Sequence, residues 1–239
     1  MRPVEDAFPG SENVLPAPVA DANWGAWVDS PWLSLLVVLC VITVIILMKN
    51  ILHALPEVVL SMGRVRGSQD IEGSLRLSRD RNLTALLLVV PFTMLLSRFR
   101  IYDPWWMAEF TPEMHLLWTF LCFAGYLVLR WILAIWLRPQ PRRMDSDVYV
   151  MARRFAWSAF ILMTLLLLVL TGIMMLCGGS DLVIKWHLID VMIVVFCVYC
   201  LRKSQIFNLS CAPFTSFLYL CALEFVPLAV WIASATVEI

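Results

Sequence analysis

A single carboxylate stands in the last apolar run of the chain. Glu224 lies near the middle of Pro213–Thr236, and no other charged residue occurs within ten residues on either side. Ionisable groups at bilayer depth are rare, face a bundle interior or a wet cavity, and mark either a structural ion pair or a functional path. Glu224 therefore predicts a buried polar site, although it names no substrate.

A polar stripe runs along the apolar segment that begins at Met114. Its members follow one another at intervals of four, three, four and four residues, which places them on one helix face. Such a stripe should face other helices, because lipid offers no hydrogen-bond partners. Alternatively, the histidine and the arginine at its two ends are interfacial anchors that snorkel in opposite directions. The stripe consists of His115, Thr119, Cys122, Tyr126 and Arg130.

The fifth apolar segment contributes a histidine and an acid. His187 and Asp190 are three residues apart and share a helix face. Together they are suited to a protonatable relay, because a neighbouring carboxylate favours the protonated imidazole while burial opposes it. The structural alternative is a paired histidine and aspartate that only closes a helix contact.

Arg130, Asp190 and Glu224 fall at similar depths if each helix rises about 1.5 Å per residue. A guanidinium on its long stem could then reach either carboxylate, and a proton or His187 would neutralise the other one. We therefore predict one polar core built from three helices. Its members are Glu224, Arg130, Asp190, His187, Tyr126 and His115.

Two prolines predict helix breaks inside the membrane. Pro227 follows Glu224 by three residues and disrupts the hydrogen bond to the Leu223 carbonyl, and Pro91 does the same to Leu87. Breaks of this kind line cavities in some membrane proteins and are plain packing features in others.

Composition places these residues in a polytopic membrane protein. Of the 239 residues, 61% are hydrophobic and 15% are charged, and the mean hydropathy is +0.82, which excludes a soluble domain. We expect an all-α fold with six transmembrane helices, of which the second barely spans a hydrocarbon core of about 30 Å. The fifth crosses only if His187 and Asp190 lie inside the membrane. The predicted helices are Trp32–Met48, Asn82–Ser97, Met114–Leu137, Phe155–Cys177, Leu182–Leu201 and Pro213–Thr236.

Lysine and arginine predict the orientation. They concentrate in the connections 49–81, 138–154 and 202–203, which the positive-inside rule assigns to the cytoplasm. Both termini are then expected outside, in the periplasm. Residues 1–30 form an acidic, Pro-rich extracytoplasmic arm, and residues 31–239 form a single transmembrane domain. Within it, the cytoplasmic segment at about 50–81 is amphipathic, which is typical of an interfacial helix or a docking surface but also fits a solvated helical hairpin.

Catalytic and cofactor chemistry finds little support in the sequence. Cys197 and Cys200 form a C-x-x-C pair, but at the cytoplasmic end of a helix, where thiols stay reduced. His115 and His187 are placed well enough to ligate a haem, yet the chain has only three histidines. We predict no enzyme, no cofactor and no metal site. A net charge of zero gives no case for nucleic-acid binding.

The C-terminal segment carries a family resemblance. Its Tyr-Leu-Cys-x-Leu-Glu-x-x-Pro block, from Tyr219 to Pro227, and the basic segment after the first helix resemble a bacterial membrane-protein family catalogued as domain of unknown function 4271. The resemblance covers roughly residues 30–236. It implies a location in the inner membrane of a Gram-negative bacterium and implies no activity.

Two functions remain open at this point. The chain is either a non-catalytic subunit or assembly partner of a membrane complex, or a small proton- or cation-linked transporter or channel that uses Glu224, Asp190 and His187. Short loops slightly favour the first function. The expected partners are the lipid bilayer and other membrane proteins or further copies of the chain, and not nucleic acid.

Overall fold

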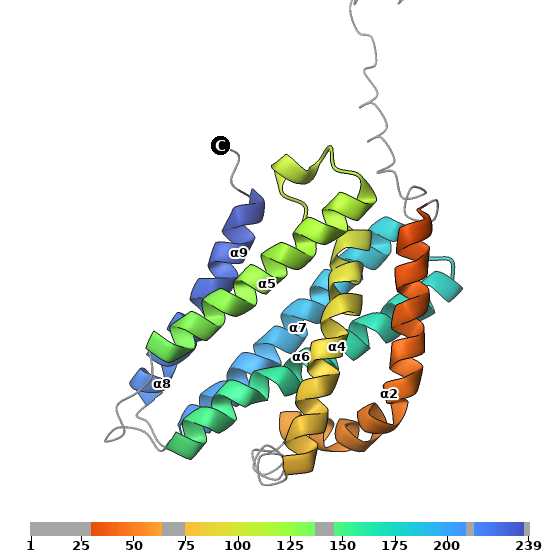
Figure 1. Ribbon diagram of the computed structural model, residues 1–239. Helices are drawn as coiled ribbons and strands as arrows, with labels where there is room; N and C mark the ends of the chain where they lie inside the picture. Colours follow the sequence, from red (N-terminus) through yellow and green to blue (C-terminus); the bar gives the residue numbers. More distant parts are fainter. Residues whose placement is uncertain (1–29, 64–74, 137–145, 209–212, 237–239) are drawn as a thin grey trace, which may run out of the picture.

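The computed structural model describes residues 30–63, 75–136, 146–208 and 213–236, apart from a few side chains within them. This described part is a bundle of helices without strands (Figure 1). Its long helices are α2 (Pro31–Gly63), α4 (Leu75–Arg98), α5 (Pro112–Trp136), α6 (Ser146–Leu176) and α7 (Asp181–Phe207). The C-terminal stretch consists of α8 (Pro213–Leu220), the π-helical turn η3 (Cys221–Phe225) and α9 (Val226–Thr236), and a short 3-10 turn, η2 (Trp105–Met107), precedes α5.

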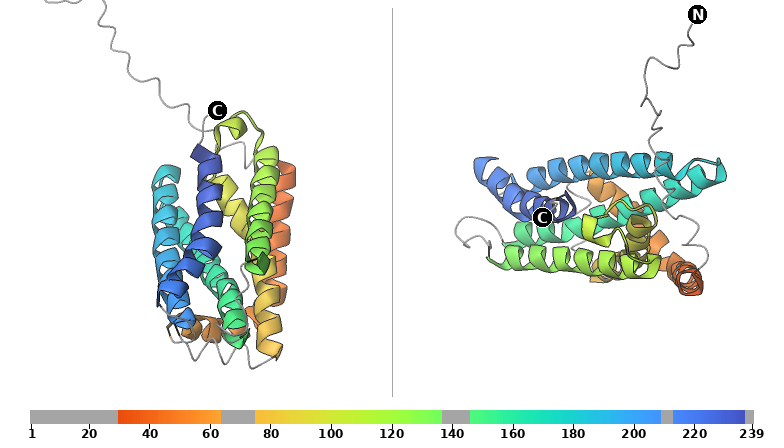
Figure 2. Two further views of the ribbon diagram at one scale, coloured as in Figure 1. Left: turned by 90° about the vertical axis from the view of Figure 1, so that its left-hand side faces the viewer. Right: turned by 90° about the horizontal axis from the view of Figure 1, so that it is seen from above.

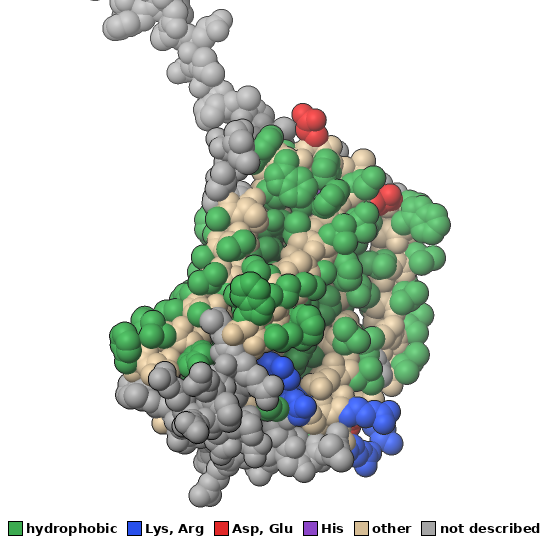
Figure 3. Space-filling model, turned by 60° about the vertical axis from the view of Figure 1, so that its left-hand side comes forward, with side chains coloured by type: hydrophobic (Ala, Val, Ile, Leu, Met, Phe, Trp, Pro, Cys, Tyr) green, Lys and Arg blue, Asp and Glu red, His purple; other side chains and the backbone are tan. Residues whose placement is uncertain are grey.

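The helices are built to cross a membrane. Among the residues that the structure describes, five spans are long and apolar enough to do so, and the bent α2 makes a sixth candidate. Hydrophobic side chains cover the middle of the molecule, while Lys and Arg gather near one edge and acidic side chains near the other (Figure 3). Because soluble monomers rarely expose so continuous an apolar surface, the chain is a multi-pass membrane protein. The all-helical prediction is confirmed, with α6 and α7 longer than expected.

The innermost helix is α4. It packs against α2, α5 and α6. In its most hydrophobic stretch 67% of the residues are buried, whereas the corresponding share is 11–28% in the other four spans. It also has the lowest hydropathy of the five, 1.2. A helix surrounded by protein can carry polar side chains such as Thr84, Thr93 and Ser97, which would be costly against lipid. Neighbouring helices thus compensate for the short apolar stretch of this span.

Pro91 does not interrupt α4, contrary to the predicted break. Its ring is buried, and neighbouring helices on three sides keep the helix continuous. The Thr93 hydroxyl lies 3.1 Å from the Val89 carbonyl and 2.9 Å from the Val90 carbonyl, so it engages the backbone just before the proline. Packing and local hydrogen bonding therefore offset the bond that proline removes.

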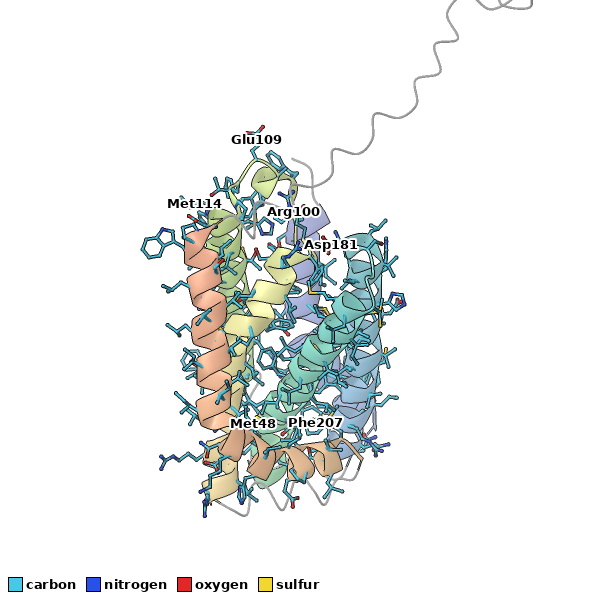
Figure 4. The ribbon with its side chains drawn as sticks, turned by 90° about the vertical axis from the view of Figure 1, so that its right-hand side faces the viewer. Met48, Arg100, Glu109, Met114, Asp181 and Phe207 are labelled. Carbon is cyan, nitrogen blue, oxygen red and sulfur yellow. The ribbon has the colours of Figure 1, made fainter. Side chains whose placement is uncertain are left out.

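Helix α2 bends by 53° between Pro31–Ile46 and Met48–Met62, and its second half runs across one end of the bundle (Figure 4). Val58 and Met62 are buried there, where α2 meets α6 and α7. This half is the first part of the amphipathic segment predicted at about 50–81. Of the remainder, residues 64–74 lie outside the described residues and residues 75–81 begin α4.

The bundle has two different ends. The start of α2 and the end of α9 lie at one end (Figures 1 and 2), together with the connection from α4 to α5. We call this the terminal end. The other end, called the loop end, holds the second half of α2 and the C-terminal end of α7, near Met48 and Phe207 (Figure 4).

Candidate functional site

Glu224 lies in a π-helical turn. The Val226 N–H donates to the Cys221 carbonyl, five residues back instead of four, so the turn is wider than an α-helical one. Pro227 follows directly and has no N–H to donate. The C-terminal helix therefore changes form beside Pro227, where a break was predicted. Within this turn the Glu224 side chain is buried.

Two cations from different helices hold Glu224. Arg130 Nη2 of α5 donates to Glu224 Oε1 at 2.7 Å, and the Lys203 ammonium of α7 donates to the same oxygen. Each cation also donates to the Tyr199 hydroxyl at 3.0 Å. We call Arg130, Tyr199, Lys203 and Glu224 the charge cluster. It joins α5, α7 and η3, which are distant in sequence.

The charge cluster is deeply buried. The side chains of Lys203 and Glu224 are each 2% exposed, and that of Arg130 is 20% exposed. Removing one partner from such a pair typically costs about 3–5 kcal/mol, because an uncompensated charge is left behind. Two positive charges face one negative charge, so the cluster has a net charge of +1 and favours the ionised form of Glu224.

One face of α7 supplies half of the charge cluster. Val195, Tyr199 and Lys203 follow at intervals of four residues and are all buried, and α7 packs extensively on α6. The Lys203 nitrogen lies 5.4 Å from the ring centroid of Tyr199 and 5.7 Å from that of Phe207. Aromatic faces at this distance attract an ammonium group, so the helix face accommodates a cation among apolar neighbours.

Arg130 and Glu224 meet as predicted, whereas Tyr199 and Lys203 were missed. The predicted fifth helix ended at Leu201, and Lys203 was assigned to a cytoplasmic connection, but α7 continues to Phe207. The spacing of four residues between Tyr199 and Lys203 was the signal that could have found them, since it places both on one helix face.

The predicted place of His187 and Asp190 in the polar core is wrong. Both side chains are exposed. The inward face of this part of α7 passes through Ile184 and Leu188 instead. His187 Nδ1 donates to the Val183 carbonyl of its own helix at 2.8 Å. Within the described residues, neither side chain contacts the charge cluster.

The polar stripe of α5 faces other helices, as predicted. His115 and Thr119 are buried, and the Thr119 hydroxyl donates to the His115 carbonyl at 2.7 Å. Arg130 turns inward to Glu224, and the ring of Tyr126, one turn earlier, lies 6.1 Å from that of Trp231 in α9, measured between centroids. Neither end of the stripe snorkels towards an interface, which the alternative interpretation required.

His115 belongs to a second polar group, at the terminal end of the bundle. Its Nδ1 is 2.9 Å from the Ser97 hydroxyl, and its Nε2 is 3.4 Å from Asp103 Oδ1, a distance too long for a strong hydrogen bond. Arg100 Nη1 lies 3.6 Å from Asp103 Oδ2. Burial alone would raise the pKa of Asp103, but its contacts with His115 and Arg100 lower that pKa below its usual value. We call Ser97, Arg100, Asp103 and His115 the outer cluster.

A cavity of about 490 Å³ lies between α5 and α7. Seen from above, these helices stand on opposite sides of the bundle (Figure 2). The wall is largely apolar and aromatic, and Arg130, Tyr199 and Glu224 give it one charged end. Towards the terminal end, Tyr102 stacks on Trp231 with ring centroids 4.9 Å apart. Burial raises the pKa of Tyr102 to about 12, so its hydroxyl stays uncharged.

Among the described residues, no site for a metal or haem is formed. No group of three His, Cys, Asp or Glu side chains there is arranged to hold a metal ion. His187 is exposed while His115 is buried in the outer cluster, so the two do not share a haem site. Cys197 is exposed, Cys200 is half-buried, and both are free thiols.

Comparison with known proteins adds no relative from which a role could be transferred. No protein-family model, no curated protein and no solved structure matches the chain. The function therefore has to be argued from the charge cluster, the cavity and the surfaces around them.

Proposed function

We propose that the chain is a non-catalytic subunit or assembly partner of a membrane complex, and that its charge cluster fixes the helix arrangement on which assembly depends. The observation that carries this proposal is the pairing of Glu224 with both Arg130 and Lys203. The three charges come from α5, α7 and η3, so their pairing ties these elements together and constrains how they can be placed relative to one another. Buried charges of this kind can specify a unique packing even where they add little net stability.

The double pairing favours a structural carboxylate over a proton carrier. A carboxylate that relays protons has to change between its charged and neutral states, and two adjacent cations oppose the neutral state of Glu224. The relay predicted from His187 and Asp190 is not formed, because both are exposed away from the charge cluster. A transporter or channel, the alternative function, would need a path through other residues.

The proposed setting is the inner membrane of a Gram-negative bacterium, with the terminal end of the bundle in the periplasm and the loop end in the cytoplasm. The concentration of Lys and Arg in the connections at the loop end supports this orientation. The resemblance of Tyr219–Pro227 to the domain of unknown function 4271 family supports the location. The proposed partners are the bilayer, other membrane proteins and further copies of the chain.

A charge-balance experiment tests the assembly role. Glu224→Gln leaves Arg130 and Lys203 facing each other without a carboxylate, so we expect the native complex isolated in mild detergent to be largely lost. Adding Lys203→Gln returns the net charge of the cluster to its original value and should restore much of that complex. Glu109→Gln is the matched control, because Glu109 is exposed at the terminal end (Figure 4). Native mass spectrometry and identification of co-purified proteins provide the readout.

Two results would contradict the assembly role. One is a wild-type chain that purifies as a monomer without partners under mild conditions. The other is a pH-dependent ion flux in proteoliposomes that Glu224→Gln abolishes while fold and complex stay intact, which would establish the transporter instead.

A further inference from the structure

We propose that the cavity between α5 and α7 binds a long-chain fatty-acid anion, with the carboxylate on Arg130 and the chain along the aromatic wall. This ligand site goes beyond the assembly role and does not depend on it. Four properties of the cavity carry the proposal: its unused hydrogen-bond donors, its charge, its volume and its opening.

Arg130 offers the cavity unused donors. Its bonds to Glu224 and Tyr199 are both donated by Nη2, which leaves Nη1 and Nε for a ligand. The side chain lines the cavity and is 20% exposed. The hydroxyl-bearing Tyr126 lines the cavity one turn earlier on the same face of α5, and no hydrogen bond engages its side chain within the described residues. The head of a ligand at this end therefore meets hydrogen-bond donors from two side chains, Arg130 and Tyr126.

Charge complementarity selects an anionic head. Arg130 and Lys203 share one carboxylate, that of Glu224, so a positive charge remains uncompensated at the polar end of an otherwise apolar cavity. Carboxylates form strong charge-assisted hydrogen bonds with arginine. One bound carboxylate would leave two cations facing two anions. A neutral alcohol of the same length would leave the positive charge in place.

The volume fits a single chain. A methylene group takes roughly the volume of one water molecule in the liquid, about 30 Å³. The cavity of about 490 Å³ is therefore of the size of a single long acyl chain. A single long acyl chain therefore suits the cavity better than the two chains of a phospholipid.

The cavity opens towards lipid between α7 and α9. Helix α7 packs on α6 and α8, whereas α9 packs on α5, so α7 and α9 diverge beyond the π-helical turn. Ile193 of α7 and Ile232 of α9 both line the cavity, and they are 56% and 51% exposed. These two side chains mark a lateral entrance, through which a chain dissolved in the bilayer reaches Arg130 without crossing water.

Palmitate binding by the full chain in phosphatidylcholine nanodiscs tests the proposal. Radiolabelled palmitate is the probe, and hexadecanol and phosphatidic acid are the competitors. We expect saturable binding of one palmitate per chain. Because hexadecanol lacks the charge and phosphatidic acid has a second chain, each should compete at least about tenfold more weakly than unlabelled palmitate.

Cavity variants locate the site. Ala159→Leu adds bulk to the α6 wall and should weaken palmitate binding at least about tenfold. Ala229→Leu makes the same change on an exposed position of α9 and should leave binding unchanged. Leu228→Trp fills the cavity from α9 and replaces Ala159→Leu if that variant does not fold, as judged by its melting temperature. Tyr126→Phe keeps the ring, removes one donor, and should weaken binding roughly three- to tenfold.

Each result that contradicts the proposal would overturn a different part of it. Equal competition by hexadecanol would overturn the anionic head, and stronger competition by phosphatidic acid would replace the fatty acid with a phospholipid. Absence of saturable binding, or folded cavity-filling variants that bind as well as the wild type, would overturn the site itself. A wild-type chain that binds palmitate but purifies as a monomer without partners would refute only the assembly role.

Discussion

The charge cluster and the outer cluster combine similar residue types in different surroundings. In the charge cluster, Arg130 and Glu224 meet at 2.7 Å, and the Glu224 side chain is 2% exposed. In the outer cluster, Asp103 stands 3.4 Å from His115 and 3.6 Å from Arg100, and its side chain is 28% exposed. Part of the Asp103 side chain is open to solvent, although its Oδ1 is enclosed, whereas the Glu224 side chain is almost completely shut off from solvent. Burial, more than residue type, thus determines how much each charged group contributes to the stability of the fold.

The largest expected effect separates the two carboxylates. Glu224→Gln should lower the free energy of unfolding by about 3–5 kcal/mol, because it leaves two cations buried without an anion. Asp103→Asn should lower it by about 1 kcal/mol or less, since a partly exposed pair is weak. Reversible unfolding in mixed detergent micelles measures both. Equal losses would break the distinction between the clusters.

Lys203→Met tests whether Arg130 alone is enough to stabilise the buried Glu224 carboxylate. The variant keeps the apolar stem and leaves Arg130 and Glu224 as a balanced pair, so we expect a loss of about 1.5–3 kcal/mol, the value of a hydrogen bond to a charged group. The same unfolding assay measures it. A loss as large as that of Glu224→Gln would mean that Arg130 alone cannot hold the carboxylate.

Tyr199→Phe tests the neutral member of the charge cluster. The hydroxyl accepts one hydrogen bond from each cation, and its loss should cost about 1–2 kcal/mol while the ring contacts remain. If Tyr199→Phe unfolds at the wild-type denaturant concentration, the hydroxyl is not part of the cluster energetically.

The outer cluster should respond to acid. Asp103 has a pKa below its ordinary value of 3.8, so the folded state binds this proton less readily than the unfolded state does. Its stabilising contribution is then present above pH 3.8 and is lost as the pH falls through the lower folded pKa. We expect the melting temperatures of the wild type and Asp103→Asn to converge as the pH is lowered from 6 to about 3. A constant difference over that range would contradict the assignment.

The smallest effect is expected at His187. Its side chain is exposed and, among the described residues, bonds only to the Val183 carbonyl of its own helix. His187→Ala should therefore change the free energy of unfolding by no more than about 0.5 kcal/mol. A change comparable to that of Tyr199→Phe would restore His187 to the polar core.

The sequence predicted one half of the charge cluster for a physical reason. An isolated Glu224 and an Arg130 at similar depth have few other ways to avoid lipid, so a shared polar core could be predicted, although Asp190 was an equal candidate for the partner of Arg130. The inward direction of α7 could not be predicted in the same way. Its helix is apolar on nearly every side, so the spacing of His187 and Asp190 shows that they share a face but not which face turns inward.

Sequence patterns could not predict where α7 ends or how α2 bends, for a different reason. Lys203 carries the charge expected of a cytoplasmic connection, and only its neighbours Tyr199 and Glu224 make a helical, buried position favourable. The second half of α2 is amphipathic in the sequence, but its direction across the bundle depends on α6 and α7, which are made later in the chain. Contacts with other helices therefore determine both the end of α7 and the direction of the second half of α2.

The burial of α4 has a consequence for biosynthesis. The translocon releases a segment into lipid according to that segment's own hydrophobicity, and α4 is the least hydropathic of the five spans. Two of the helices that cover it, α5 and α6, are synthesised afterwards. We therefore expect α4 to stay at the protein-lined exit until α5 and α6 emerge, so that the three helices enter the bilayer together.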